Sequence, residues 1–227
     1  MNDAELSQNS EGASSLPEAS QKRSAKTRDR LIEASIEIFS QRGFKAATTR
    51  DIVQAAGVAL ASVPYYFKTK EQLWKAAVDR IYQDFNERLV DRRRRFPEQD
   101  SRAQSRAQLR EFILFTAGKP EFIRLLLHEG TSESERLVWF VETHFRPQFE
   151  YVKEEVEKAQ EDGYGRLGRA DHLFFMIIGS VGLLYAVEPA FNLLTGESPT
   201  GEDMLTAHVD SILELFYPSE ELASRPT

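Results

Sequence analysis

Residues 27–74 decide the fold, and they read TRDRLIEASIEIFSQRGFKAATTRDIVQAAGVALASVPYYFKTKEQLW. The first part of this stretch, from Thr27 to about Gln41, carries one apolar stripe at helical spacing, which predicts an amphipathic helix. The stripe consists of Leu31, Ile32, Ser35, Ile36 and Phe39. Gly43 follows shortly afterwards, where a left-handed cap would end the helix.

Two shorter helices are expected after that glycine. Thr48 and Asp51 have the spacing of a capping box, so a second helix opens after Thr48. Gly57 ends it, and a third helix is expected from Leu60 to Phe67. The inward-facing anchors would be Ile52, Val53, Ala56, Val58, Val63 and Phe67. A turn at a residue without Cβ, flanked by apolar anchors, is typical of a helix-turn-helix, whose second helix can enter the major groove of DNA.

The outer surface of this unit supplies candidate DNA contacts. The positions nearest the bases would be Leu60, Ala61, Ser62, Pro64, Tyr65 and Tyr66. The expected phosphate contacts, which flank the two short helices, are Thr49, Arg50, Lys68 and Lys70. Three short helices with a glycine turn also occur as purely structural units, but the whole string is more specific.

The string resembles the DNA-binding domain of the TetR family of transcriptional regulators. The matching residues are Phe39, Gly43, Phe44, Thr48, Thr49, Ile52, Ala55, Ala56, Gly57, Val58, Val63, Tyr65, Tyr66, Phe67, Lys70, Glu71 and Leu73. The chain departs from the family pattern at Ala61, often a glycine, at Pro64, often a phosphate-contacting tyrosine, and at Tyr66, more commonly a histidine. The resemblance implies a homodimer that binds a palindromic operator, most often as a repressor, and that is released or re-set by an unidentified small-molecule effector.

Charge is unevenly distributed along the chain. The net formal charge of −7 divides into −4 over residues 1–21, +6 over residues 22–75 and −9 over residues 76–227. Positive charge therefore coincides with the helix-turn-helix, where phosphate neutralisation needs it. Taken alone, the +6 segment would also fit an ordinary solvated surface.

The first 23 residues are too polar to bury enough area to fold, so residues 1–23 are expected to be a disordered extension. Basic residues cluster where this extension meets the first helix, namely Lys22, Arg23, Lys26, Arg28 and Arg30. The segment is either an arm that touches the DNA backbone or minor groove, or a plain flexible tail, which we favour.

Composition excludes several classes of protein. The chain has no cysteine, which rules out disulfides, thiolate zinc sites and a cysteine nucleophile. The longest apolar run, residues 173–187, is shorter than the roughly 18–20 residues that span a bilayer. Because the N-terminus also lacks a basic-then-apolar signal pattern, we expect a cytoplasmic protein.

The remainder of the chain is expected to be helical. A long helix from about Lys70 carries the apolar stripe Leu73, Trp74, Ala77, Val78, Ile81, Tyr82, Phe85 and Leu89. It ends at Arg92–Arg95, roughly 30 Å from the helix-turn-helix, so a solvated helix end is favoured there over a nucleic-acid patch. Further helices are expected at Arg102–Ala117, Pro120–Glu129, Glu133–Glu161 with a kink at Pro147, Ala170–Leu194 and Glu202–Phe216.

The sequence thus predicts an all-α chain. Its domains would be the extension (1–23), a helix-turn-helix domain (24–70), a helical ligand-binding and dimerisation domain (71–217) and a flexible tail (218–227). In TetR-like proteins the helices corresponding to residues 170–194 and 202–216 pair across a two-fold axis. Gly179, Ser180 and Gly182 would allow the close approach that such pairing requires, whereas packing within one chain is the alternative.

An effector site is harder to place from sequence. The candidate lining residues are Phe112, Phe115, Phe122, Leu126, Glu129, Trp139, Phe140, His144, Phe174 and Ile178. Glu129 and His144 could orient a polar or cationic group of a ligand, whereas ordinary core packing is the favoured explanation for any single aromatic residue. The four histidines show no compact ligand spacing, so no metal site is expected, and no cofactor is implied.

Two other classes of function fit the sequence less well. An enzyme is disfavoured because the chain has no glycine-rich phosphate loop, no G-x-S-x-G elbow and no spacing that implies a catalytic triad. An all-helical dimeric interaction protein with a vestigial DNA-binding head remains the alternative. It predicts an ordinary charged third-helix face, whereas the chain places Tyr65 and Tyr66 beside Lys68.

Overall fold

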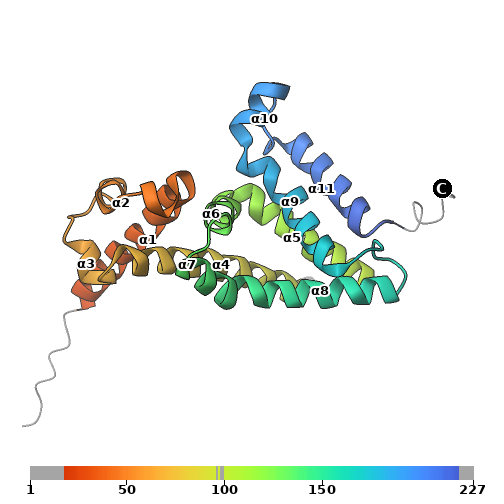
Figure 1. Ribbon diagram of the computed structural model, residues 1–227, viewed down its shortest axis with the longest axis horizontal. Coiled ribbons are helices and arrows are strands. Elements are labelled where there is room, and N and C mark those ends of the chain that lie inside the picture. Colours follow the sequence, from red (N-terminus) through yellow and green to blue (C-terminus); the bar gives the residue numbers. More distant parts are fainter. Residues whose placement is uncertain (1–17, 96, 98–99, 220–227) are drawn as a thin grey trace, which may run out of the picture.

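The computed structural model describes residues 18–95, 97 and 100–219, and this part of the chain is helical without strands (Figure 1). The all-α prediction is confirmed. The helices are α1 (Glu18–Ala46), α2 (Thr49–Ala56), α3 (Ser62–Phe67), α4 (Lys70–Arg95), α5 (Ser101–Gly118), α6 (Glu121–Gly130), α7 (Glu135–Phe140), the π-helical turn η1 (Val141–Phe145), α8 (Arg146–Glu161), α9 (Ala170–Ala186), α10 (Glu188–Thr195) and α11 (Glu202–Phe216).

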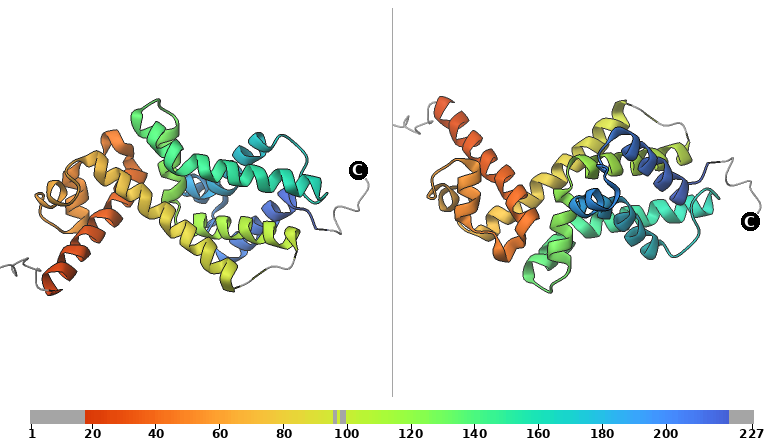
Figure 2. Two further views of the ribbon diagram at one scale, coloured as in Figure 1. Left: turned by 90° about the horizontal axis from the view of Figure 1, so that it is seen from below. Right: turned by 90° about the horizontal axis from the view of Figure 1, so that it is seen from above.

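The elements form two parts joined by α4. The head, residues 18–69, contains α1, α2 and α3, and the body, residues 100–219, contains α5 to α11 (Figures 1 and 2). The long α4 runs from the head along the body, and α9, α10 and α11 rise on one side of it (Figure 1). This arrangement places α3 at one end of the molecule (Figure 1).

The first helix is longer than the sequence suggested. It begins at Glu18 instead of Thr27, so residues 18–23, predicted to be disordered, are helical. Thr27 lies inside the helix, where its Oγ1 donates to the Arg23 carbonyl, and Ser24 anchors this end through a 3.1 Å hydrogen bond to the Tyr66 hydroxyl. Contact with α3 therefore stabilises a segment whose composition alone favoured disorder. Residues 1–17 of the predicted extension lie outside the described residues.

The turns of the head follow the predicted chemistry with one difference. Gly43 has the expected positive φ of 70°, but its ψ of 170° lies outside the left-handed helical region and the chain turns helical again up to Ala46. Thr48 and Asp51 form the predicted capping box. Gly57 ends α2 with φ 61° and ψ 43°, and a Cβ there would also lie 2.7 Å from an Arg30 nitrogen. The left-handed backbone therefore favours glycine at position 57, whereas the Arg30 side chain, a long flexible one, could move aside.

The third helix is shorter than predicted, because it begins at Ser62 instead of Leu60. Pro64 is the third residue of α3 and lies in its first turn, where a helix tolerates proline. The N–H groups on either side of it are bonded, Val63 to the Leu60 carbonyl and Tyr65 to the Ala61 carbonyl, so α3 forms despite the missing donor. Val63 and Phe67 are buried, as the sequence predicted.

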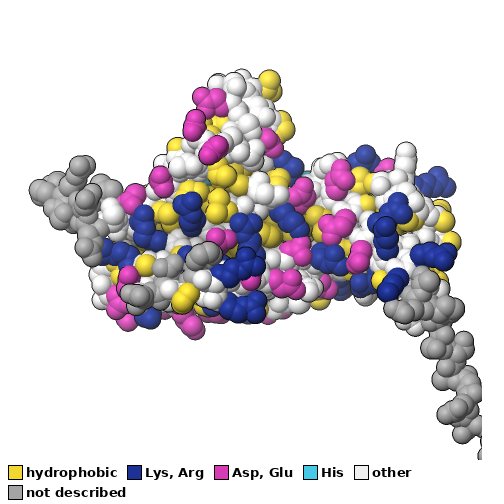
Figure 3. Space-filling model, turned by 180° about the vertical axis from the view of Figure 1, so that it is seen from behind, with side chains coloured by type: hydrophobic (Ala, Val, Ile, Leu, Met, Phe, Trp, Pro, Cys, Tyr) yellow, Lys and Arg dark blue, Asp and Glu magenta, His cyan; other side chains and the backbone are white. Residues whose placement is uncertain are grey.

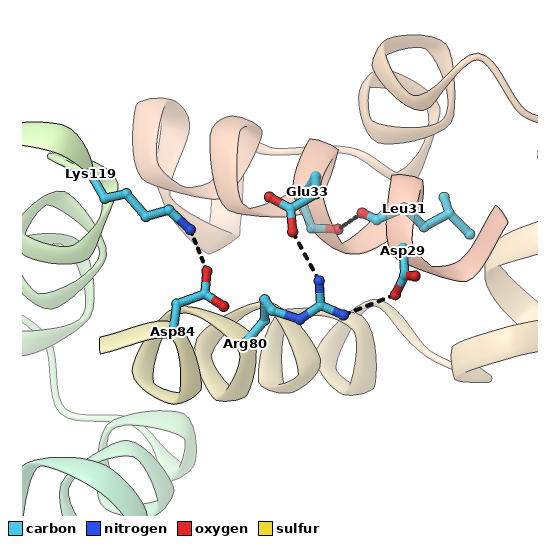
Figure 4. Close-up of polar contacts among 7 residues, drawn as sticks. Asp29, Leu31, Glu33, Arg80, Asp84 and Lys119 are labelled. Atoms are coloured by element: carbon cyan, nitrogen blue, oxygen red, sulfur yellow. Dashed lines mark hydrogen bonds and ion pairs between the residues drawn. The ribbon is translucent and has the colours of Figure 1, made fainter. Parts of the chain in front are cut away.

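One apolar core joins the head to the body along α4. The predicted stripe of α4 is buried from Leu73 to Phe85, and only Leu89 is half-buried. Arg80 adds a polar link, because its guanidinium contacts Asp29 at 2.9 Å and Glu33 at 3.1 Å, both on α1 (Figure 4). On the next turn Asp84 pairs with Lys119 at the end of α5 (Figure 4). The middle of α4 is thus fixed to the head on one side and to the body on the other.

Two prolines shape the body. Pro147 lies at the start of α8, directly after the η1 turn, so the predicted kink takes the form of a π-helical segment. The prediction of one continuous helix over Ala170–Leu194 was wrong. The segment is broken into α9 and α10 with a bend of 71°. Pro189 in the first turn of α10 explains the break, since it cannot donate to the preceding turn.

The remaining predicted elements lie close to their expected bounds. The predicted helix Glu202–Phe216 matches α11. Arg92–Arg95 form the last turn of α4, where Arg94 and Arg95 are exposed and pair with Asp91. In the predicted C-terminal tail, the Ser219 backbone donates to Glu214, and residues 220–227 lie outside the described residues. The domain boundaries themselves stay predictions.

No single helix among the described residues has the length and apolar composition to cross a bilayer, although the bent pair α9 and α10 would pass the same test together.

We expect Thr48→Ala to lower the free energy of unfolding by about 1 kcal/mol, because it removes the acceptor of the Asp51 N–H at the start of α2. Urea unfolding followed by circular dichroism measures the change. Thr49→Ala, one residue further on, is the matched control and should cost less. Equal losses in the two variants would contradict a specific capping role for Thr48.

The packing of α9 on α6 can be tested at Gly182, because a Cβ built there would lie 2.5 Å from Ile123 Cγ1 on α6. Gly182→Ala should therefore destabilise the protein by roughly 1–3 kcal/mol through overpacking. Gly118→Ala is the control, since no atom lies within 4 Å of its Cβ position. If both variants unfold at the same denaturant concentration as the unmodified chain, α9 does not pack on α6 as closely as described.

Candidate functional site

The outward face of α3 is open to solvent. Tyr65 is 75% exposed and Leu60, just before the helix, is 48% exposed. Ala61 and Pro64 are exposed as well, and Ser62 is half-buried. The buried anchors Val63 and Phe67 hold the opposite face against the head. The structure therefore brings the predicted base-reading positions together on one accessible surface, with the exception of Tyr66.

Tyr66 has a structural contact of its own. Its hydroxyl is 3.1 Å from Ser24 Oγ on α1, and its ring meets Tyr65 edge-on with centroids 4.7 Å apart. The side chain is half-buried as a result. Tyr66 thus connects the N-terminal turns of α1 to α3 and supports the orientation of Tyr65.

The predicted phosphate contacts divide into two groups. Arg50 and Lys68 are exposed, and Thr49 is half-buried at the start of α2. Lys68 has φ 61°, the single positive φ of a non-glycine residue in the described ranges, so the link between α3 and α4 is conformationally strained.

Lys70 differs from its predicted role, because its side chain lies against the junction of head and body instead of pointing outward. Its Nζ lies 4.4 Å from the centre of the Phe44 ring, and Arg136 of α7 lies over the same ring at 3.8 Å. Burial, and then the positive charge of Arg136, lower the pKa of the Lys70 ammonium. A cation held in this way contributes to the junction of head and body and is not directed at a phosphate.

Basic side chains of α1 extend the surface around α3. Arg28 lies over the Phe67 ring at 5.4 Å, and Arg30 donates to the Gly57 carbonyl at 3.3 Å. Lys26 and Arg23, further toward the N-terminus, are exposed. Figure 3 shows Lys and Arg side chains gathered over the head. Because residues 18–23 are helical, these side chains are presented by a continuation of α1 and not by an extended arm.

A cavity of about 90 Å³ lies in the body. Its walls come from α4, α5, α6, η1, α8, α9 and the residue after α11. The lining residues are Tyr82, Phe85, Leu89, Ser105, Gln108, Leu109, Phe112, Phe122, Phe145, Gln148, Tyr151, Val152, Glu155, Phe174, Ile177, Ile178 and Tyr217. Four residues predicted to contact an effector, namely Phe112, Phe122, Phe174 and Ile178, are among them.

Four of the six remaining effector candidates are apolar, and these four lie outside the cavity. Phe115 and Phe140 are buried in the core that joins head and body, and Leu126 packs against it. Trp139 meets Trp74 at 5.6 Å between ring centroids. These side chains share the helical spacing of the lining residues but belong to other faces of their helices. The three aromatic ones contact rings of α4, namely Trp74, Tyr82 and Phe85.

The two polar candidates, Glu129 and His144, also lie outside the cavity, and both contact protein partners. Glu129 is 5% exposed, pairs with Arg136 at 3.0 Å and accepts from Ser134 at 2.7 Å. His144 contacts Asp79 at 2.8 Å and stacks on Tyr82. Both carboxylate oxygens of Glu129 and the Nε2 atom of His144 are therefore engaged by protein partners.

Sequence reasoning missed the polar lining of the cavity, namely Ser105, Gln108, Gln148, Tyr151 and Glu155. A signal was present, because Gln108 precedes Phe112 by four residues and Glu155 follows Tyr151 by four, which places each pair on one helix face. The aromatic residues alone drew attention in the sequence. Among the residues that the structure describes, no group of three potential metal ligands is found.

An apolar face of α9 is exposed. Phe175 is 61%, Met176 46% and Leu183 54% exposed, and nothing lies within 4 Å of a Cβ placed on Gly179. Leu193 and Leu194 of α10 are even more exposed, and Figure 3 shows hydrophobic side chains at the tip of the projecting part of the body. Gly182, predicted to allow close approach of a partner, instead faces inward onto Ile123.

Known sequences match this chain most specifically in its N-terminal part. Residues 31–77 match the model of bacterial regulatory proteins of the tetR family. YttP, a probable HTH-type transcriptional regulator of Bacillus subtilis, is 25% identical over 138 residues, which are 60% of this chain and 67% of that protein. The HTH-type transcriptional repressor KstR2 of Mycolicibacterium smegmatis is 38% identical over 68 residues, 30% of this chain and 31% of that one. The chain thus spans about two thirds of the first relative and about a third of the second.

Solved structures match over most of the chain. AibR, in complex with isovaleryl coenzyme A and operator DNA, aligns with a TM-score of 0.68 at 20% identity, over 85% of this chain and 98% of that one. HlyIIR, a hemolysin II transcriptional regulator, aligns with a TM-score of 0.61 at 21% identity, over 83% and 97% of the two chains. At these identities the likeness concerns the fold. Residues 31–77 thus carry the sequence pattern of the tetR family of bacterial regulatory proteins, and the chain as a whole has the fold of these solved structures.

Proposed function

We propose that this protein is a sequence-specific, DNA-binding transcriptional regulator that acts in the cytoplasm as a homodimer on a palindromic operator, and that a small molecule in the body re-sets it. The observation that carries the proposal is the exposed face of α3, with Tyr65 at its centre and Arg50, Lys68 and the basic turns of α1 around it. Repression is the favoured sign of regulation, because several relatives, including KstR2, are described as repressors.

DNA recognition would use α3 and its surroundings. A six-residue helix with an exposed tyrosine can lie in the major groove, while cations on either side neutralise phosphates. Arg50 comes from the first turn of α2, and Lys68 from the link to α4. The acidic balance of the body would disfavour docking by any other face.

Two heads are required for a palindrome, and the exposed face of α9 supports pairing of two copies. A row of large apolar side chains in water is unfavourable, and covering it by a second chain would remove that cost. Gly179 leaves space on the same face for the partner to approach closely. Dimerisation would fix two copies of α3 at a separation of roughly 34–36 Å, one turn of duplex DNA.

Effector control would act through the walls of the cavity. Tyr82 and Phe85 line the cavity and belong to α4, which is tied to the head through Arg80. A ligand that binds one arrangement of these walls more tightly shifts the population toward it and changes the separation of the heads. AibR, whose structure contains both an acyl coenzyme A and operator DNA, supports this combination in a protein of the same fold.

Arg50→Ala should weaken binding to every duplex sequence and reduce the slope of log affinity against log salt by about 1, because one phosphate contact is lost. Fluorescence anisotropy with labelled duplex over a salt series measures both. Tyr65→Ala should weaken binding without changing that slope, since a tyrosine carries no charge at neutral pH. Arg95→Ala, an exposed cation at the far end of α4, is the control and should change neither quantity.

A chain that shows no salt-dependent binding to any duplex would contradict the regulator and favour the alternative, an interaction protein with a vestigial head. Lys70→Ala adds an internal check. Because the Lys70 ammonium lies against Phe44, Lys70→Ala should change the salt slope less than Arg50→Ala does.

Leu183→Glu should convert the protein to monomers and weaken operator binding, because it places a charge in the apolar face of α9. Sedimentation velocity gives the oligomeric state at matched concentrations. Val138→Glu on α7, at a site at least as exposed but on another helix, is the control and should remain dimeric. Dimers of unchanged stability in the Leu183 variant would place the interface elsewhere.

A further inference from the structure

The cavity in the body contains one hydrogen-bond donor without a partner. Gln108 lines the cavity, and its Nε2 atom is fully buried with no hydrogen bond. Among the buried side-chain atoms that lack a partner in the described part of the chain, this is the one that belongs to a lining residue. A buried amide N–H without an acceptor is unfavourable, and an acceptor on a bound molecule would remove that cost.

The orientation of this amide is fixed by its neighbours. Arg93 of α4 donates to the Tyr151 hydroxyl oxygen, so the hydroxyl hydrogen is available to another acceptor. Tyr151 donates it to Gln108 Oε1 at 2.6 Å. Since the Oε1 atom accepts that bond, the Nε2 atom must be the free end. The chain of contacts therefore presents a donor, and not an acceptor, to the interior.

The charge of the lining excludes one class of molecule. The residues around the cavity include no Lys, Arg or His, whereas Glu155 contributes a carboxylate. An anionic ligand would lose its hydration without gaining a cationic partner and would be repelled by Glu155. A free carboxylate or a phosphate is therefore disfavoured inside the cavity.

Shape and surface define the rest of the ligand. The polar residues of α5 and α8 lie toward the far end of α4, where Arg93 reaches Tyr151. The other end is aromatic, because Phe85, Phe112 and Phe122 contact one another with ring centroids 5.5 to 6.0 Å apart. A cavity of about 90 Å³ holds roughly six to nine non-hydrogen atoms if each needs about 10–15 Å³.

We propose that the cavity binds a small, neutral, apolar molecule or acyl group that carries one carbonyl-type acceptor, with the acceptor on Gln108 Nε2 and the hydrocarbon part among the phenylalanines. This rests on the proposed function, because it identifies the chemical class of the effector. Ketones, esters, amides and lactones of this size satisfy the donor without bringing a negative charge near Glu155.

Four probes with the same number of non-hydrogen atoms test the class: 2-heptanone, hexanoate, heptylammonium and n-octane. Isothermal calorimetry and thermal unfolding of the full chain, without DNA, measure their affinities. We expect 2-heptanone to bind at least about tenfold more tightly than n-octane, since one hydrogen bond separates them, and hexanoate to bind least. Preferred binding of hexanoate, or equal affinity for ketone and alkane, would overturn the proposal, and so would the absence of ketone binding.

Gln108→Glu keeps the side-chain shape but replaces the donor by an acceptor. It should lower affinity for 2-heptanone about tenfold and raise affinity for heptylammonium, thereby reversing their order. Gln148→Glu is the matched control, because Gln148 also lines the cavity but its Nε2 already donates to Asn86 at 3.1 Å. If the two variants change the ketone affinity equally, the Gln108 amide is not the donor to the ketone oxygen.

The outcome is separable from that of the proposed function. Ligand affinity is read without DNA, and DNA affinity is read without ligand. If 2-heptanone binds through Gln108 but leaves DNA affinity unchanged, the chemical class of the ligand stands and effector control of the heads fails. If DNA binds but the ketone does not, the regulator stands and this ligand class is wrong.

Discussion

The burial of α4 against α1 is the interaction on which the rest of the structure depends. Trp74 and Ile81 are almost completely buried, and they belong to one continuous core that reaches from Ile52 in the head to Phe122 in the body. A short helix-turn-helix has too little area to hold a fixed position by itself. By sharing one core with the body through α4, the head gains both its stability and its orientation.

The junction also uses charge, at some energetic cost. Glu129 is buried where α6 meets the head, and it is stabilised by Arg136, whose guanidinium also lies over Phe44 and Trp74. Such a pair contributes little net stability, because both charges lose hydration, but removing one partner leaves the other unpaired. The network therefore favours one arrangement of α6, α7 and the head over alternatives, which a core of interchangeable apolar side chains would not do.

Local chemistry explains which features the sequence predicted. Capping at Thr48, the turn at Gly57 and the buried stripe of α4 depend on neighbours a few residues away, and each was confirmed. The helical start at Glu18 and the inward turn of Lys70 depend on tertiary partners, namely Tyr66 and Phe44, which no spacing rule reveals. The cavity was only partly predicted for the same reason. Aromatic periodicity identifies a buried helix face, but not whether that face meets a cavity or another helix.

The position of the cavity determines how a ligand can act. A molecule larger than the present volume has to move a wall, and the walls differ in what holds them. On the α4 side, Tyr82 packs on Phe122, and Arg80, a neighbour two residues earlier, is bound to Asp29 and Glu33 of α1. Displacement of this wall therefore moves α1 with it, because the ion pairs and the shared core resist separation. In a dimer held at α9, such a displacement changes the distance between the two copies of α3, and operator geometry tolerates little change in that distance.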